Sequence, residues 1–199
     1  MRRSQNLNVR QQPPVDDPGF SSRRLLEAIL IVLTIVGIDQ FTKWLALNNL
    51  ERGNCSVDGA CVDLFWTLRF NLVFNPGASF STGEGLGPLI GAISFVMAGV
   101  MIWLAARTPQ PTQRRIYSAI AGGALGNGLD RLFRADDGFL SGKVIDFIDF
   151  QWWPVFNIAD MAIVGSVCLA VAFSFFAKDG DAGDAGITSS ETHDAITKS

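Results

Sequence analysis

The chain has 199 residues, 48% of them hydrophobic and 18% charged, with a formal net charge of −3 at pH 7. So small a negative charge offers no electrostatic basis for nucleic-acid binding, and nucleic acid is not an expected partner. The charged residues gather at the two ends and in a few loops, leaving four apolar stretches near membrane-spanning length. The pattern predicts an α-helical integral membrane protein with four transmembrane helices.

Residues 1–22 and 178–199 are polar tails with too few apolar side chains for a packed core, so we expect both to be disordered. Between them, residues 23–177 are predicted to form one membrane domain. Its first span covers about residues 25–45. We expect this span to be retained, because no small-residue cleavage site of a signal peptide follows it.

Hydrophobicity alternates with a period of two over residues 64–75, which predicts a half-buried strand. We expect a small extracytoplasmic sheet within about residues 52–82, between the first two spans. Cys55 and Cys61 precede this strand. A disulfide bridge and two free thiols are both open for this pair.

The other spans are predicted at residues 88–106, 116–133 and 155–177. Gly122 and Gly126 stand four residues apart, which permits close packing of the third span against a neighbour. Lys and Arg are more numerous on the side that carries both tails, so both termini are predicted to be cytoplasmic in a bacterial cell membrane. Four tryptophans are then expected as interfacial anchors on the opposite side: Trp44, Trp66, Trp152 and Trp153.

The prominent polar residues associated with the spans fall near the extracytoplasmic end on this topology, apart from Glu27 near the inner flank of the first span. A carboxylate in the hydrocarbon region costs roughly 3 kcal/mol, so intramembrane ionisable groups mark functional sites by default. Asn127 and Asp130 stand three residues apart, as do Asn157 and Asp160, so each pair shares one helix face. The full set is Asp39, Lys43, Asn75, Asn127, Asp130, Arg131, Asp146, Asn157 and Asp160.

These residue types favour carboxylate chemistry. His193, the one histidine, lies in the tail, so no metal or other cofactor is expected. A serine paired with Lys43 or Lys143 is a weaker alternative. Two carboxyl groups in a low-dielectric pocket share one proton, because like charges a few ångströms apart cannot both ionise. Residue reasoning leaves open whether Asp130 or Asp146 is the partner of Asp160.

Five motifs resemble, in the same order, the sequence blocks of the bacterial lipoprotein signal peptidase family, signal peptidase II. They are DQFTK (39–43), NPGASFS (75–81), GGALGNGLDR (122–131), VIDFIDF (144–150) and FNIAD (156–160). The resemblance implies an intramembrane aspartic endopeptidase. Such enzymes remove the signal peptide from diacylglyceryl-modified prolipoproteins and cleave before the lipidated cysteine.

The resemblance also implies roles for individual residues. Asp146 and Asp160 would be the catalytic pair, with one activating a water and the other polarising the scissile carbonyl, whereas Asp130 would be structural. The implied partners are a lipid-modified prolipoprotein and membrane lipids, and we expect a monomer. The residues implied to bind substrate or to support the pair are Asp39, Lys43, Asn75, Gly77, Asn127, Asp130, Arg131 and Asn157.

Two other classes of function fit some of these residues. A small transporter could use Asp39, Asp130 and Asp160 as a proton relay, although the inner halves of the second and fourth spans are almost wholly apolar. A non-catalytic assembly subunit could use the same cluster to bind partner helices.

Overall fold

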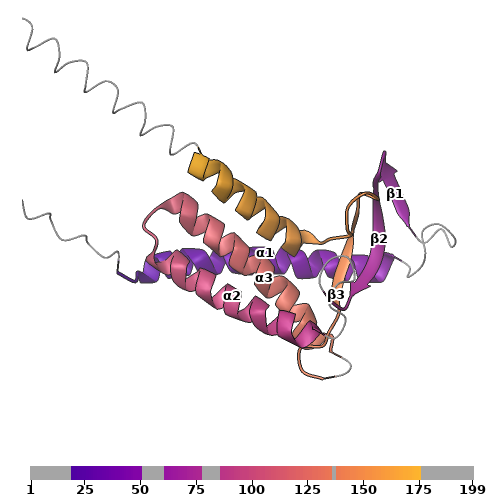
Figure 1. The fold of residues 1–199 in the computed structure, drawn as a ribbon, viewed down its shortest axis with the longest axis horizontal. Coiled ribbons are helices and arrows are strands. Elements are labelled where there is room, and N and C mark those ends of the chain that lie inside the picture. The colour runs from indigo at the N-terminus through magenta and orange to yellow at the C-terminus, as the bar shows by residue number, and fades with distance from the viewer. Residues whose placement is uncertain (1–18, 51–60, 78–85, 136–137, 176–199) are drawn as a thin grey trace, which may run out of the picture.

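The computed structural model describes residues 19–50, 61–77, 86–135 and 138–175. Within these residues, four helices lie side by side and a small sheet sits at one end of the bundle (Figure 1). The helices are α1 (Ser22–Asn49), α2 (Gly87–Arg107), α3 (Pro111–Phe133) and an unlabelled C-terminal helix described over Ile158–Phe175. The strands are β1 (Val62–Phe65), β2 (Leu68–Asn75) and β3 (Val144–Asp149).

In the part of the chain that the structure describes, three helices are long and apolar enough to cross a membrane: α1, α2 and the C-terminal helix. Most of their side chains are not buried against protein, which suits contact with lipid. The third predicted span, residues 116–133, is present as a helix, α3, but its low mean hydropathy leaves it outside this set, so four spans are not confirmed. Polar residues at both ends and glycines between them account for that value.

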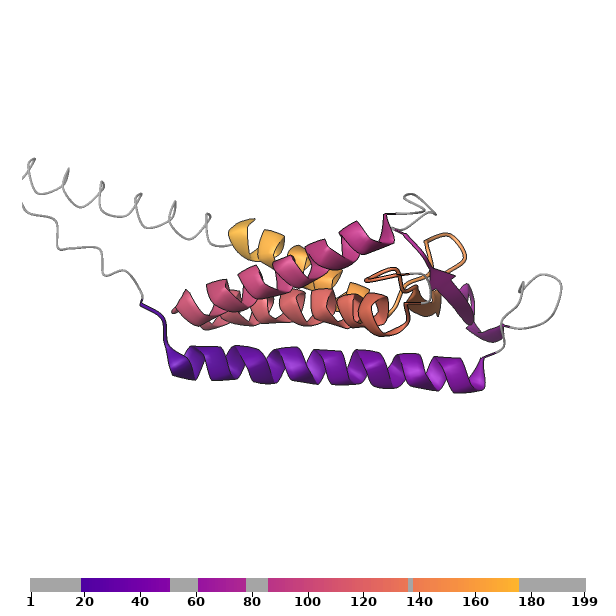
Figure 2. The same cartoon turned by 90° about the horizontal axis from the view of Figure 1, so that it is seen from below.

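Helix α3 lies between α1 and α2 (Figure 2) and is the most enclosed of the three labelled helices. Its glycines permit the close approach. A Cβ atom built on Gly122 would lie 2.9 Å from the Ile35 Cβ of α1, and one built on Gly126 would lie 2.7 Å from Asp39 Oδ2. The predicted close packing at these two glycines is confirmed, and its partner is α1.

The sheet is antiparallel in the order β1-β2-β3. The single strand expected over residues 64–75 is wrong in one respect: the chain turns at Trp66 and Thr67 and continues as β2. Trp66 adopts a φ of 51° and is 93% exposed, whereas Leu72 in β2 is buried. Strand β3 comes from the segment between α3 and the C-terminal helix, for which no strand was predicted from the sequence. The question of pairing between Cys55 and Cys61 falls partly outside the described residues, because Cys55 is not among them.

An apolar cluster joins the sheet to the end of α1. It is built from Ala46 of α1, Leu72 of β2, and Ile145 and Phe147 of β3. Successive side chains of a strand point to opposite faces, so burying Ile145 and Phe147 in this cluster turns Asp146 the other way, toward the helices. The start of α1 and the end of the C-terminal helix lie at the bundle end away from the sheet (Figure 1).

Candidate functional site

Asp160 is held by the start of the C-terminal helix. Asn157 precedes the first helical residue, and its Oδ1 accepts a hydrogen bond from the Asp160 N–H at 3.0 Å. In return, Asp160 Oδ2 accepts from the Asn157 N–H at 3.2 Å. This reciprocal pair is a capping box, which satisfies two otherwise unpaired N–H groups of the first turn. The same interaction fixes the direction of the Asp160 carboxyl group.

Asp146 is placed by the sheet. It is 2% exposed and lies opposite Val73 in the β2–β3 ladder. Its Oδ2 accepts a hydrogen bond from Asn75 Nδ2 at 3.1 Å, and its Oδ1 accepts from Asn157 Nδ2 at 2.7 Å. Asp146 is thus held by the end of β2 and by the residue that caps the C-terminal helix.

Two asparagine side chains connect the carboxyl groups of Asp146 and Asp160. Asn157 Nδ2 donates to Asp146 Oδ1 and also to Asn127 Oδ1, at 3.0 Å. Asn127 Nδ2 in turn donates to Asp160 Oδ1 at 2.8 Å. The hydrogen-bonded chain therefore runs Asp146–Asn157–Asn127–Asp160.

The electrostatic environment favours a proton on Asp146 near neutral pH. Burial and the negative charge of Asp160 raise the pKa of Asp146 to about 7, against the opposing effects of Asn75, Asn157 and Lys43. A carboxyl group with a pKa in this range can exchange a proton at physiological pH, as general acid–base catalysis requires.

Lys43 lies next to the Asn127 amide and is fully buried. Its Nζ is 2.8 Å from Asp39 Oδ2, 2.8 Å from Asp130 Oδ2 and 2.9 Å from Asn127 Oδ1, so all three ammonium donors have partners. The other oxygen of Asp39 accepts from the Ala159 N–H at 2.9 Å. Asp39 and Lys43 thereby tie α1 to α3 and to the first turn of the C-terminal helix.

Asp130 differs from Asp146 in having both carboxylate oxygens engaged by cations. Besides Lys43, Arg134 Nε lies 3.0 Å from Asp130 Oδ1, and Gln40 Nε2 donates to the same oxygen at 3.1 Å. Asp130 Oδ2 also accepts from the Ile145 N–H at 3.2 Å. These contacts connect α1, α3 and β3, so Asp130 holds these three elements together.

Arg131 fastens the end of β2 to the end of α3. Its guanidinium donates to the carbonyls of Pro76 at 3.3 Å, Gly77 at 2.6 Å and Gly142 at 3.4 Å. Gly77 N–H also donates to Asn75 Oδ1 at 3.1 Å, which orients the amide that contacts Asp146. Every predicted site residue thus belongs to one connected polar network. Among the described residues, no group of three or more His, Cys, Asp or Glu could hold a metal ion.

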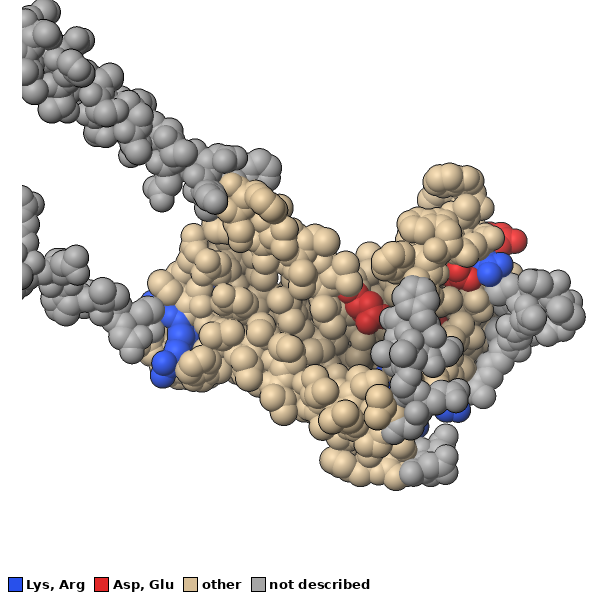
Figure 3. All heavy atoms as spheres, in the orientation of Figure 1, with Lys and Arg blue, Asp and Glu red and all other residues tan. Residues whose placement is uncertain are grey.

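An apolar cavity of about 440 Å³ opens beside Asp160. Asp and Glu atoms reach the surface where the helices meet the sheet, and Lys and Arg atoms lie on the surface both there and at the far end of the bundle (Figure 3). The lining residues are Phe150, Trp152, Trp153, Phe156, Asp160, Met161, Val164 and Gly165.

Sequence reasoning missed several members of this region. Trp152 and Trp153 were expected only as interfacial anchors, yet both line the cavity. Gln40 sits next to Asp39 in the DQFTK motif but had no assigned role. Asp149 was also missed: it stands three residues after Asp146, so alternation would place the two carboxylates on opposite faces of a strand and gives no signal for a second buried carboxylate.

Comparisons with known proteins relate most of the chain to a family and to a solved fold. A family model described as Signal peptidase (SPase) II matches residues 31–176. Proteins called lipoprotein signal peptidase from Mycolicibacterium smegmatis and Mycobacterium avium are 36% and 37% identical to this chain. The alignments cover 85% and 84% of this chain, and 72% and 87% of those proteins. A solved structure described as a bacterial membrane enzyme, obtained by the in meso method at 2.3 Å resolution, superposes with a TM-score of 0.62 and 25% identity. That superposition covers 75% of this chain and 87% of the other.

Proposed function

Because the chain belongs to the signal peptidase II family, we propose that it removes the signal peptide from diacylglyceryl-modified prolipoproteins as an aspartic endopeptidase. It cleaves the peptide bond immediately before the lipidated cysteine. The observation that carries this proposal is the pair of carboxyl groups of Asp146 and Asp160, linked by two asparagines at the edge of an apolar cavity.

The proposed mechanism uses one proton shared by Asp146 and Asp160. The ionised member takes a proton from a water molecule, whose oxygen attacks the scissile carbonyl carbon. The protonated member donates to the carbonyl oxygen as the tetrahedral intermediate forms. Proton transfer to the leaving nitrogen then breaks the C–N bond, which releases the signal peptide carboxylate and the free amino group of the lipidated cysteine.

The asparagines keep both carboxyl groups oriented throughout this cycle. An amide side chain has a donor for an ionised carboxylate and an acceptor for a neighbouring donor, and it does not titrate. Asn127 and Asn157 therefore hold the geometry in each protonation state. Pre-positioning of this kind lowers the barrier by removing the need for reorganisation during reaction.

We further propose that all four helices span the membrane, with both termini cytoplasmic and the site at the extracytoplasmic face. Helix α3 has 23 residues, or about 35 Å at 1.5 Å per residue, enough for a hydrocarbon core of roughly 30 Å. Its position between α1 and α2 shields its polar groups from lipid. Arginines flank the bundle end that carries the start of α1, which supports a cytoplasmic location for that end.

The partners in this proposal are the lipid-modified prolipoprotein and the surrounding membrane lipids, and the protein acts as a monomer without a cofactor. Every buried side-chain nitrogen and oxygen in the described residues has a hydrogen-bond partner within the chain. The polar network of the site is thus satisfied without a second subunit.

Purified protein and a diacylglyceryl-modified prolipoprotein peptide test the proposal. We expect wild type to cleave before the modified cysteine and to leave the unmodified peptide uncut. Asp146→Asn and Asp160→Asn should each lower kcat by at least about 10³-fold while thermal unfolding still shows a folded protein. The matched control is Asp63→Asn, which changes an exposed carboxylate of β1 and should cleave normally. Normal turnover by either dyad variant contradicts the aspartic mechanism.

A further inference from the structure

A buried ion pair anchors the turn that follows β3. Asp149, the last residue of β3, is 3% exposed, and its Oδ2 lies 2.8 Å from Arg69 Nε of β2. Asn71 Nδ2 donates to the same oxygen at 3.0 Å, and the Gln151 N–H donates to Oδ1 at 2.6 Å. Burial alone raises the pKa of Asp149, but the hydrogen bonds from Asn71, Gln151 and Arg69 and the charge of Arg69 outweigh it and hold the pKa below its usual value. The carboxylate is therefore ionised at neutral pH.

The turn itself has an unfavourable backbone conformation that this anchor maintains. Gln151 has a φ of 67°, in the left-handed region that non-glycine residues rarely occupy. Its N–H is bound by Asp149, and its side-chain Nε2 donates to the Thr67 carbonyl at 3.1 Å. The backbone N–H and the side-chain amide of Gln151 are thus both hydrogen-bonded to the sheet region, and the shape of the turn depends on these two hydrogen bonds.

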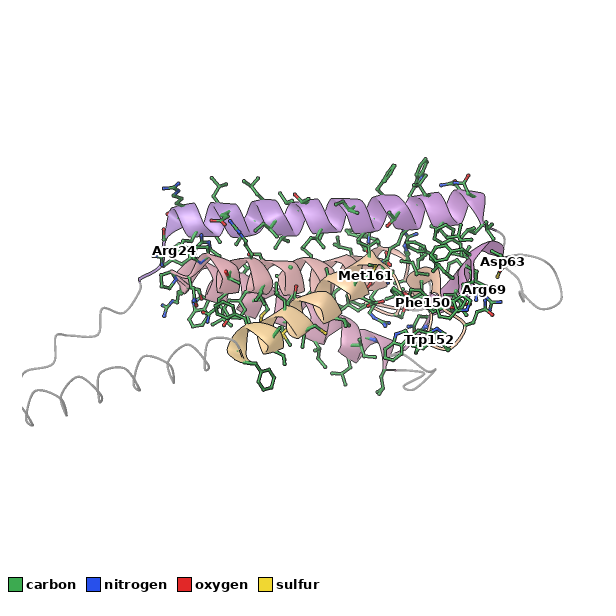
Figure 4. The ribbon with its side chains drawn as sticks, turned by 90° about the horizontal axis from the view of Figure 1, so that it is seen from above. Arg24, Asp63, Arg69, Phe150, Trp152 and Met161 are labelled. Carbon is green, nitrogen blue, oxygen red and sulfur yellow. The ribbon has the colours of Figure 1, made fainter. Side chains whose placement is uncertain are left out.

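The anchored turn presents an aromatic wall. The Phe150 ring is stacked on Trp152 at a centroid distance of 5.8 Å and on Phe156 at 5.7 Å, and Trp153 meets Trp152 edge-on at 6.2 Å. These four rings form one side of the 440 Å³ cavity, and Met161, Val164 and Gly165 of the C-terminal helix contribute the other. Figure 4 shows Phe150 and Trp152 beside Met161, with Arg69 next to them at the sheet.

The chemistry of the cavity suits an aliphatic chain. Asp160 is its one charged lining residue, and the other lining side chains are apolar. A peptide segment inserted there would leave backbone N–H and C=O groups unpaired, which is costly. An acyl chain has no such groups. Met161 and Val164 are 51% and 57% exposed on a helix apolar enough to span a membrane, so the cavity opens toward lipid.

We propose that Asp149 is a positioning residue whose anchor to Arg69 holds the aromatic wall, and that the walled cavity receives an acyl chain of the lipid-modified cysteine. The inference rests on the proposed function, because it takes the scissile bond to lie at Asp160. The lipid on the adjacent cysteine then enters the cavity beside that residue.

Steady-state kinetics with two substrates tests this inference. The peptides are identical except that one carries palmitoyl chains on its cysteine and the other butyryl chains. We expect Asp149→Ala to raise KM for the palmitoyl peptide about tenfold, with less than about twofold change in kcat or in KM for the butyryl peptide. Quenching of tryptophan fluorescence by brominated palmitoyl peptide should weaken in the same variant.

A second variant acts on the cavity without touching the anchor. Gly165 lines the cavity and a Cβ atom built on it meets nothing within 4 Å, so Gly165→Leu starts its larger side chain from open space at the cavity. It should raise KM for the palmitoyl peptide selectively, as Asp149→Ala does.

Two matched controls accompany these variants. Glu27→Gln removes an arginine–carboxylate pair, with Arg114 at 2.8 Å, at the other end of the bundle. Gly99→Leu enlarges a helical glycine of α2 that also has nothing within 4 Å and does not line this cavity. Both should retain the wild-type KM for each peptide.

The outcomes separate the inference from the proposed function. Equal losses on both peptides would show that Asp149 has only a structural role and would overturn the inference. If KM depends on which residue precedes the cysteine, and not on the acyl length, the cavity binds a peptide side chain. That result would also overturn the inference. Wild-type protein that cleaves neither peptide refutes the proposed function itself.

Discussion

At the scale of single residues, the site depends on amides placed between charges. Asn127 accepts hydrogen bonds from Lys43 and from Asn157 and donates one to Asp160, so it connects the ammonium group to the Asp160 carboxyl group without a direct ion pair. An aspartate at this position would add a third negative charge beside the pair, and a leucine would leave the Lys43 ammonium one partner short. Asparagine meets both requirements.

The pKa of Asp146 predicts the pH dependence of cleavage. Its pKa is raised to about 7, so the pair loses its shared proton as the pH rises through that value, and kcat/KM should fall there. The hydrogen bond from Asn75 stabilises the ionised form and lowers the pKa. Asn75→Ala should therefore raise the pKa and move the alkaline limb to higher pH, as measured from pH–rate profiles of both proteins. An unchanged limb, or one moved to lower pH, contradicts the assignment of this limb to Asp146.

Asp130→Asn should destabilise the protein by about 3 kcal/mol, because it leaves the buried Lys43 and Arg134 with one carboxylate fewer. Glu27→Gln breaks a pair that is partly exposed and should cost under about 1 kcal/mol. Chemical unfolding followed by circular dichroism compares the two variants. An Asp130→Asn protein with wild-type stability and no activity would instead place Asp130 in the chemistry.

At the scale of elements, helix α3 is shaped by what its glycines allow. Gly122 and Gly126 admit α1, whereas a Cβ on Gly123 would collide with the Ala159 carbonyl of the C-terminal helix. The contacts on these two sides bring Asp39 of α1 and Asn127 of α3 toward the capped start of the C-terminal helix. The close approach of the α3 backbone to its neighbouring helices is thus required for the short distances from Lys43 Nζ to Asp39, Asp130 and Asn127.

Gly126→Ala should separate α1 from α3, because the new methyl group would lie 2.7 Å from Asp39 Oδ2. We expect a loss of about 1–3 kcal/mol, as for other overpacked interiors, together with lower activity. Gly99→Ala is the matched control, since its methyl group meets nothing within 4 Å and alanine is the better helix former. Thermal unfolding of both variants checks this, and equal melting temperatures would contradict the packing argument.

The strands show which features of the sheet local sequence patterns do not predict. Alternation over residues 64–75 correctly indicates extended chain but does not reveal the turn, because Trp66 and Thr67 are not typical turn residues. Strand β3 has a nearly continuous buried pattern, which periodicity alone does not distinguish from other buried segments. Its pairing with β2 is decided by contacts between residues about seventy positions apart.

At the scale of the whole molecule, the two ends of the bundle carry different chemistry. One end holds the sheet, the paired carboxyl groups and the cavity, and the other holds a group of arginines (Figure 3). Helices that cross the membrane an even number of times return the chain to its starting side. In Figure 1 the start of α1 and the end of the C-terminal helix lie at the same end of the bundle, which is consistent with that path.

Epitope tags fused to the two termini test the proposed orientation. Both tags should resist protease added to intact spheroplasts and be removed once the membrane is permeabilised, because α1 begins and the C-terminal helix ends on the side proposed to be cytoplasmic. A cytoplasmic protein of known location, assayed in the same preparation, controls for membrane integrity. Removal of either tag from intact spheroplasts contradicts the four-span topology with cytoplasmic ends.

The sequence by itself determined the membrane class, the approximate helices and the set of polar residues that gather at one end, because hydrophobic length and charge placement are local properties. It left Asp130 and Asp146 as equal candidates for pairing with Asp160 until the family resemblance was considered. Only the tertiary structure shows why they differ: Lys43 and Arg134 engage Asp130, whereas β3 turns Asp146 toward Asn157. The hairpin turn, the Asp149 anchor and the aromatic cavity were likewise decided by long-range contacts, which no single segment of the chain encodes.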